Sequence, residues 1–261
     1  MSAVTTEHTA SALSESGKQQ AAQHGNKAHS DGGWDSNAKG YVPVQTRSAR
    51  FTSTNPADFP DVIGYEAEWK LSPIALFRPL LDGELDGSTY EFTATGAPGA
   101  TVEWVDRTDS RVGAAGKPEE KASANAWNSF DKALSITVTS DEHIELNVSR
   151  STLGGSPRAG HTLITAKANS RATVVLDNAG EAFLSENVEI VVEDGAELTV
   201  ISVQEWNADA IHLSDQFATV GRDARLKHFV VSLGGKVVRV NPSVHLIAPG
   251  ADAELFGLYF A

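Results

Sequence analysis

The second half of the chain alternates between apolar and polar residues with the period of a β-strand. Residues 134–138 and 188–192 are two such runs. Clusters of turn-forming residues separate the runs, at residues 177–180, 193–195, 221–223, 234–235 and 249–250. No segment with helical spacing interrupts them. The pattern therefore predicts a strand-rich domain over residues 133–261.

A weak repeat runs through this domain. A small residue is followed by a polar and then an apolar or small one in four copies, which begin at Ala172, Ala196, Ala224 and Ala251. The alanines are 24, 28 and 27 residues apart, and a small or apolar residue stands four positions before each, at Ala168, Val192, Val220 and Ile247. A period of this length is typical of a solenoid, whose coils bury their inner faces only by stacking. We therefore expect a β-solenoid, with an antiparallel β-sandwich as the alternative.

The residues before the strands divide into two regions. Residues 1–43 lack hydrophobic periodicity and are predicted to be a disordered tail. Residues 44–132 are mixed, with two short strands expected within residues 88–108. A short helix is predicted after Ser72, with Pro73 at its first position and with Pro79 and Gly83 as its boundaries.

A second helix is predicted to start at Pro118, because two acidic residues follow in what would be its first turn. Trp127, Phe130 and Leu134 have helical spacing and should share one face of this helix. Aromatic residues at this spacing are typical of core packing. The mixed region is thus expected to be helical at both of these points.

Composition narrows the function classes. The 261 residues include 34 acidic and 21 basic ones, giving a net charge of −13. This balance argues against binding to nucleic acid, and it serves either solubility or the docking of a basic partner. There is no cysteine, which excludes disulfides and thiolate metal ligands. No apolar run resembles a signal peptide or crosses a bilayer, so we expect a cytoplasmic protein with no membrane partner, although a lack of cysteine also suits the cell exterior.

Two groups of histidines and their neighbours invite a chemical interpretation. His228 and His245 lie in separate predicted strands and could stack on neighbouring coils as an iron-handling face, or be ordinary packed or solvated imidazoles. His212, Ser214 and Asp215 contain the residue types of a hydrolytic triad. The turn that exposes a nucleophilic serine is missing, however. Neither group is assigned a function.

Two polar segments complete the search for chemistry. Residues 154–158 are rich in glycine but lack the lysine and the following helix of a phosphate-binding loop. Asp106, Asp109 and Arg111 follow Trp104, and paired carboxylates near aromatics are found in carbohydrate-active β-solenoids. These residues give the alternative of a secreted carbohydrate-active enzyme. No catalytic, cofactor-binding or metal-binding residue is assigned, and we expect no enzymatic activity and no cofactor bound by this chain alone.

Several scaffold motifs resemble consecutive parts of the SufB/SufD family. They occur at residues 48–52, 68–73, 194–198, 221–226, 231–235 and 250–259. The Glu-Trp-Lys run at residues 68–70 is closer to the SufD branch. The resemblance implies a right-handed parallel β-helix preceded by a small helical region. It also implies a SufD-type subunit that supports iron–sulfur cluster assembly with a SufB-type scaffold and a SufC-type ATPase.

The chain departs from this family at its end. Residues 257–261 lie where family members continue through further coils, in which the pairing surface and the implicated polar residues lie. No functional residue can therefore be transferred from the family, and we expect a fragment or a truncated product. An unpaired last coil also favours self-association through its edge. A free-standing structural or interaction solenoid is the remaining alternative.

Overall fold

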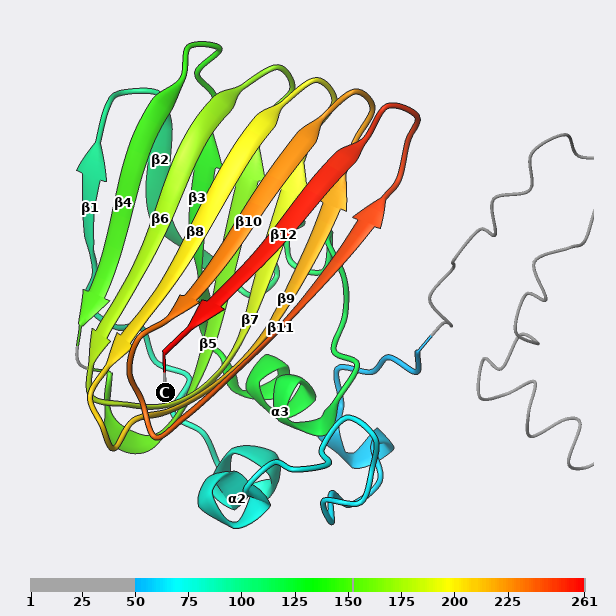
Figure 1. The fold of residues 1–261 in the computed structure, drawn as a ribbon, viewed down its shortest axis with the longest axis vertical. Helices are drawn as coiled ribbons and strands as arrows, with labels where there is room; N and C mark the ends of the chain where they lie inside the picture. Colours follow the sequence, from blue (N-terminus) through cyan, green and yellow to red (C-terminus); the bar gives the residue numbers. More distant parts are fainter. Residues whose placement is uncertain (1–49, 152, 261) are drawn as a thin grey trace, which may run out of the picture. The chain divides into compact units, whose positions relative to one another are not determined.

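The strands form a parallel β-solenoid of about 5 turns, in which successive strands from β3 onward lie alternately in two sheets. The computed structural model describes residues 50–151 and 153–260, so the predicted tail at 1–43 lies outside the described residues. Residues 52–260 belong to one unit. Figure 1 shows the two sheets as layers lying one behind the other. The expected β-solenoid is confirmed, and the β-sandwich alternative is wrong because the strands from β3 onward pair in parallel.

The first sheet is called the open sheet. In spatial order it contains β1 (Thr93–Gly96), β4 (Ile144–Ser151), β6 (Arg171–Gly180), β8 (Glu197–Trp206), β10 (Arg225–Ser232) and β12 (Asp252–Tyr259). The second is called the covered sheet. In order it contains β2 (Ala100–Asp106), β3 (Lys132–Val138), β5 (Gly154–Ala166), β7 (Ala182–Val192), β9 (Ile211–Val220) and β11 (Val237–Leu246).

β1 and β2 are the two short strands expected within residues 88–108; β1 pairs antiparallel with β4, and β2 pairs antiparallel with β3. Every later pairing is parallel. Apart from a register shift between Gly154 and Arg158 in β5, these pairings are in register, so equivalent residues stack from coil to coil. Val138, Ala166, Val192 and Val220 form one such inward row and are all buried. Apolar rows of this kind build the core between the sheets.

The repeat read from the sequence needs one correction in its first copy. Arg171 pairs with Glu197, so the residue equivalent to Ala196 is Ser170, and Ala172 stacks on Leu198 instead. Ser170 is buried, as a small residue at a coil corner must be. The pattern missed it because serine replaced alanine at that corner.

The small or apolar residues predicted four positions before each copy of the repeat need a similar correction. Ala166 pairs with Val192, so the predicted Ala168 lies two positions too late. Leu246, and not Ile247, pairs with Val220. The turn after Leu246 contains one residue more than the turns after Val192 and Val220, and this moved the count by one.

The first predicted helix is found with different ends. It is α2 (Ile74–Asp82), and Pro73 is its N-cap, with no side-chain capping bond. Pro79 lies inside the helix, so the prediction that it forms a boundary is wrong. The backbone of Phe77 is non-helical and kinks the helix, which accommodates the proline. The helix ends at Gly83 as predicted.

The second predicted helix is shorter than expected. It is α3 (Lys121–Ser129), so its predicted start at Pro118 is wrong. Glu120 is its N-cap residue and pairs with Arg239 on β11 at 2.7 Å, which holds it outside the helix. Leu134 lies in β3, and only Trp127 and Phe130 share the predicted packing role. The remaining helical turn is η1 (Pro56–Asp58).

The outer face of the covered sheet is polar yet buried beneath α3 and residues 107–118, here called the strap. Ser185 on β7 donates to the carbonyl oxygen of Ala122 at 3.0 Å. Asn187 exchanges two hydrogen bonds with Ser123, at 2.5 and 2.9 Å. Polar side chains of the sheet therefore determine where the helix lies.

Glu189 binds the strap in the same way. Its carboxylate accepts hydrogen bonds from the backbone N–H groups of Gly113 and Ala115, at 2.7 and 2.9 Å. His161 Nε2 lies 2.9 Å from the same carboxylate, and its ring stacks on Phe130 with centroids 4.3 Å apart. The buried carboxylate of Glu189 therefore holds the strap in place. Through His161 it also contacts the aromatic ring of Phe130.

A third buried contact lies at the start of α3. Burial and the nearby Asp215 raise the pKa of Glu120 to about 8, against the attraction of Arg239. Burial likewise raises the pKa of Asp215, although Asn241 donates to it at 3.0 Å. Arg239 also lies over the ring of Trp69, with 4.1 Å from guanidinium carbon to ring centroid. Two acids therefore share one cation here.

Candidate functional site

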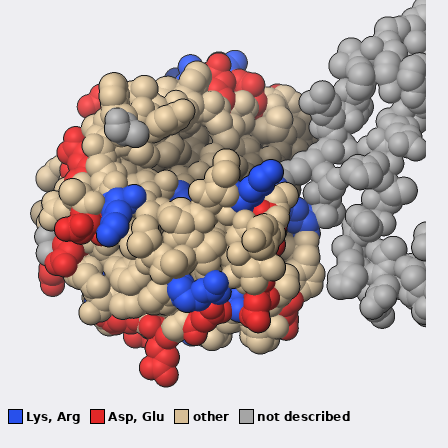
Figure 2. Space-filling model, turned by 60° about the horizontal axis from the view of Figure 1, so that its bottom comes forward, with Lys and Arg blue, Asp and Glu red and all other residues tan. Residues whose placement is uncertain are grey.

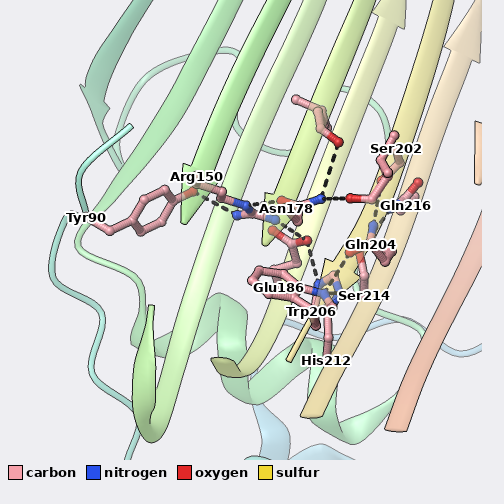
Figure 3. A network of polar contacts seen from close by, with 12 residues as sticks. Tyr90, Arg150, Asn178, Glu186, Ser202, Gln204, Trp206, His212, Ser214 and Gln216 are labelled. Atoms are coloured by element: carbon pink, nitrogen blue, oxygen red, sulfur yellow. Dashed lines mark hydrogen bonds and ion pairs between the residues drawn. The ribbon is translucent and has the colours of Figure 1, made fainter. Parts of the chain in front are cut away.

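A row of polar residues points into the solenoid from the open sheet, whose other inward positions in β4, β6 and β8 are mostly apolar. Arg150, Asn178, Gln204 and Ser232 pair in register across β4, β6, β8 and β10. Arg150 and Asn178 are 6% and 1% exposed, and Gln204 is fully buried. Burying polar groups costs free energy unless they are hydrogen-bonded. This row is therefore the most chemically distinct feature of the interior (Figure 3).

Arg150 has a partner for each guanidinium nitrogen. Nε donates to Asn178 Oδ1, Nη1 donates to the Tyr90 hydroxyl at 2.9 Å, and Nη2 donates to Glu186 at 2.7 Å. Burial alone would lower the pKa of Arg150, but Glu186 and Tyr90 raise it above its usual value. Arg150 is thus a fixed positive charge inside the protein, with its nitrogens engaged by neighbours.

Glu186 links Arg150 to a histidine. Burial would raise the pKa of Glu186, but Arg150 and His212 lower it to about 2, so the carboxylate is ionised. His212 Nε2 lies 2.7 Å from Glu186, and Trp206 Nε1 donates to His212 Nδ1 at 3.2 Å. Indole N–H can only donate, so Nδ1 is the acceptor and the proton lies on Nε2, donated to Glu186.

The network continues from the tryptophan toward the middle of the interior. Trp206 Nε1 also donates to Gln204 at 2.9 Å, and Gln204 donates to Ser202 at 2.8 Å. Gln216 on β9 donates to Ser214 at 3.2 Å. The connected side chains in Figure 3 come from both sheets, so the network ties the two layers together.

Two acceptor atoms of this region have no partner within the described residues, Glu186 Oε2 and Gln216 Oε1. An unpaired buried acceptor costs about 1–3 kcal/mol. Each guanidinium nitrogen of Arg150 makes one hydrogen bond, and the two unpaired atoms of this region are both acceptors. The side chains of the site include no nucleophilic thiol, because the 261 residues contain no cysteine.

The two histidines considered as an iron-handling face are not brought together. His228 lies in β10 of the open sheet, is 2% exposed, and has its pKa lowered to about 4 by burial. His245 lies in β11 of the covered sheet and is exposed. They belong to different sheets, so the idea that they stack is wrong. Within residues 50–151 and 153–260, no three side chains of the His, Cys, Asp and Glu types are grouped as metal ligands.

His228 instead faces a cavity. The cavity has a volume of about 470 Å³ and is lined mainly by apolar residues of β10, β11 and β12, such as Val230, Val240 and Leu255. Nε2 of His228 has no hydrogen-bond partner among the described residues. The low pKa keeps this imidazole neutral, which suits an apolar lining.

The triad considered from the sequence is also not assembled. His212 points inward to Glu186 and Trp206, and Ser214 accepts from Gln216. Asp215 points to the opposite side of β9, where Asn241 donates to it. Neighbouring residues of a strand face opposite sides of the sheet, so this separation follows from the strand period.

The glycine-rich segment at residues 154–158 begins β5 and is not a phosphate loop. Arg158 within it pairs with Asp86 at 2.6 Å and donates to two backbone carbonyls, those of Leu153 and Ser88. The segment thus serves a strand start, and the phosphate-binding interpretation rejected from the sequence gains no support.

The acidic cluster near Trp104 is engaged in turns. Arg111 holds Asp109 with two bonds of 2.8 Å and lowers its pKa to about 2. Asp106 accepts two bonds from Thr108, which lower its pKa. A glycosidase needs one carboxyl with a raised pKa, and neither acid has one.

The sequence did not reveal Arg150 or Glu186, because a charged residue in an alternating strand is normally placed on the solvent side. The signal in the sequence that could have revealed the inward polar row was the period of the coils. Arg150, Asn178 and Gln204 stand at corresponding positions of successive coils, where apolar residues were expected.

Residues 50–151 and 153–260 contain no helix with both the length and the apolar character needed to span a bilayer. The face shown in Figure 2 carries basic and acidic side chains intermixed, without a broad basic patch.

Comparison with known proteins places the chain in a family. Residues 149–261 match the family described as "SUF system FeS cluster assembly, SufBD core domain". An iron-sulfur cluster assembly SufBD family protein of Mycobacterium leprae is 37% identical over 202 residues, which cover 76% of this chain and 52% of the relative. Proteins of the same description from Mycobacterium bovis and Mycobacterium tuberculosis are each 36% identical over 202 residues, covering 76% of this chain and 51% of the relative.

The chain thus spans about half the length of the curated relatives it matches. No solved structure matches it. The match over residues 149–261 covers the coils that carry the buried network, and the resemblance seen in the scaffold motifs is confirmed. The chain belongs to the SufB/SufD family.

Proposed function

We propose that the chain is a SufD-type scaffold subunit that supports iron–sulfur cluster assembly in the cytoplasm without catalysing a reaction itself. Its partners would be a SufB-type scaffold and a SufC-type ATPase. The observation that carries this proposal is the match of residues 149–261 to the SufBD core, over coils whose charged interior is bonded to itself.

Two features favour a supporting role over a cluster-holding one. Iron–sulfur clusters are held chiefly by cysteine thiolates, and this chain has none to offer. The candidate acids and histidines are separated or engaged in turns, as described above. Cluster ligands would therefore come mainly from another subunit. The SufD-type assignment rests on the Glu-Trp-Lys run at residues 68–70.

Co-purification tests the partners. The full chain, tagged, is expressed together with the SufB-type and SufC-type proteins of the same cell, and retained proteins are identified by mass. We expect both to be retained, and cluster transfer to an apo-ferredoxin to be faster with the chain than without it. A chain that retains neither protein and leaves the transfer rate unchanged contradicts the proposal.

A second experiment separates support from catalysis. The chain alone is incubated with iron, a sulfide source and the apo-ferredoxin, and the transfer rate is compared with that of the complex. We expect no acceleration by the chain alone. Acceleration by the chain alone would show that it acts as an enzyme.

A further inference from the structure

Two buried carboxylates share one guanidinium at the start of α3. Glu120 and Asp215 are 8% and 5% exposed, and Arg239 pairs with Glu120 at 2.7 Å. Asn241 donates to Asp215 at 3.0 Å but brings no charge. With both carboxylates ionised, Glu120, Asp215 and Arg239 would hold an excess negative charge largely away from water, which costs free energy. One added proton makes these three residues, here called the shared contact, neutral.

Neighbouring charged groups do not supply the missing positive charge. Lys121 follows Glu120 in the chain, but its amine is engaged by two other carboxylates, at 3.1 and 2.6 Å. Glu68 faces Glu120, and Glu119 faces Asp215, so both add negative charge. The arrangement therefore favours a proton held between the two carboxylates. The raised pKa values of Glu120 and Asp215 agree with this.

Arg239 also ties a turn of the chain to β11. Residues 66–72, here called the tryptophan turn, place Trp69 in the interior, where it is 2% exposed. Arg239 donates to the carbonyl oxygen of Glu68 at 3.3 Å and lies over the ring of Trp69, 4.1 Å from its centroid. One guanidinium thus contacts both the tryptophan turn and the first residue before α3. Its position depends on the carboxylate of Glu120.

The two carboxylates differ in their freedom to move. Asp215 lies within β9, which pairs with β7 on one side and with β11 on the other. Glu120 is the N-cap residue of α3, has an extended backbone, and makes no capping bond with its side chain. When the excess charge appears, Glu120 can therefore turn toward water, while the strand pairing keeps Asp215 in place.

We propose that Glu120 is a pH-sensitive latch that attaches the start of α3 and the tryptophan turn to the covered sheet. While the two carboxylates share a proton, Glu120 holds Arg239 in position, and both segments stay closed. When the proton passes to solvent, Glu120 turns to water and both segments loosen, while the coils stay folded. No covalent bond changes, and the inference does not depend on the proposed function.

The direction and range of the effect follow from linkage. Glu120 has a pKa of about 8 in the closed form, against 4.5 as its ordinary value. The closed form therefore binds more protons between these values. The equilibrium constant for opening should rise by up to about tenfold per pH unit from about pH 4.5, and it should level off above about pH 8.

Hydrogen exchange of the full chain, measured by mass spectrometry from about pH 5 to about pH 9, tests the latch. Each observed rate is divided by the intrinsic rate at the same pH. The amides of residues 66–72 and 121–124 should follow the predicted rise and plateau, while those of β7 should not. No rise in the two segments overturns the proposal. An equal rise in β7 also overturns it, because the whole chain would then be opening.

Three variants assign the effect to the shared contact. Glu120→Gln stays neutral and can still accept from Arg239, so its opening should not depend on pH. Glu119→Gln is the matched control, because it removes a neighbouring carboxyl outside the shared contact and should keep the pH dependence. Asp215→Asn removes the competing acid, so an ionised Glu120 should stay with Arg239 and the rise should disappear. Unchanged pH dependence in Glu120→Gln or in Asp215→Asn contradicts the latch.

A direct titration gives a readout that does not involve opening. The carbon-13 shift of the Glu120 carboxyl, assigned by its loss in Glu120→Gln, should change with a midpoint near about pH 8 in the folded chain. The midpoint should fall in Asp215→Asn, because the repulsion between the two acids is then gone. A midpoint near 4.5 in the unmodified chain overturns the proposal.

Discussion

The two outer faces of the solenoid differ in a way that reverses the usual rule. The covered sheet presents Ser185, Asn187 and Glu189 outward, and they are buried under α3 and the strap. The open sheet presents an apolar row outward, and Phe256 within it is 46% exposed. The row consists of Val175, Ile201, Phe229 and Phe256. Hydrogen bonds are directional and hold one segment in one place, whereas apolar contact has no direction. The polar outer face is therefore held to one attached segment, while the apolar outer face is partly open to solvent.

The largest expected effect comes from the interior that both sheets share. Arg150→Met leaves Glu186 buried without its main counter-charge, so the free energy of unfolding should fall by about 3–5 kcal/mol. Urea unfolding of the full chain measures it. Arg150→Met combined with Glu186→Leu removes both charges and should recover part of the loss. A double variant no more stable than the single one would contradict the view that the unpaired charge causes the loss.

The next effect tests the covered face. Glu189→Ala leaves two backbone N–H groups and His161 without their acceptor, and we expect a loss of about 2–4 kcal/mol by the same measurement. Glu197→Ala is the matched change on the open sheet. Its partner Arg171 lies 3.9 Å away and both are half exposed, so a loss within about 0.5 kcal/mol is expected. Similar losses in the two variants would remove the contrast between the faces.

A different kind of effect is the pH dependence of the contact at the start of α3. The folded pKa of Glu120 is about 8 against 4.5 as its ordinary value, so the folded chain binds more protons between these values. The contribution of this group to stability should therefore fall as the pH rises from about 4.5 to 8. Asp215 acts in the same direction, and Arg239 from β11 and Glu68 also face Glu120.

Unfolding curves across this pH range measure the fall, and Glu120→Gln should flatten it. Glu186 acts in the opposite sense, because its pKa is lowered to about 2. The contribution of Glu186 to the free energy of unfolding is present above about pH 4.5 and is lost as the pH falls toward 2. An unchanged slope in Glu120→Gln would show that this carboxyl does not titrate in the range.

The smallest effect is expected on the open face. Phe256→Ala removes a stacked but half-exposed ring, so the monomer should lose only about 0.5–1.5 kcal/mol. Thermal unfolding of the full chain measures it. A loss as large as that of Glu189→Ala would show that Phe256 contributes to the core of the chain as a buried residue does.

The sequence was sufficient for the solenoid but not for its site. Strand alternation and recurring corners predict coils, since stacking imposes one pattern on every turn. The first corner was misplaced because Ser170 fills the space that alanine fills at Ala196. Arg150 and Glu186 meet across 36 residues and two sheets, and only the register brings them together. The position of α3 depends on tertiary contacts such as that of Glu120 with Arg239, which local signals do not contain.

The parallel strands after β6 pair in register without interruption, so equivalent residues of successive coils are evenly spaced along the solenoid. Each coil advances the chain by one strand spacing, about 4.8 Å, whatever the side chains are. A group repeated on successive coils, such as the charge at Arg171, Glu197, Arg225 and Asp252, is therefore presented at even steps. Adding or removing one whole coil would change the length of the surface without changing its spacing, while a single residue gained within a strand would put every later residue of that strand out of step.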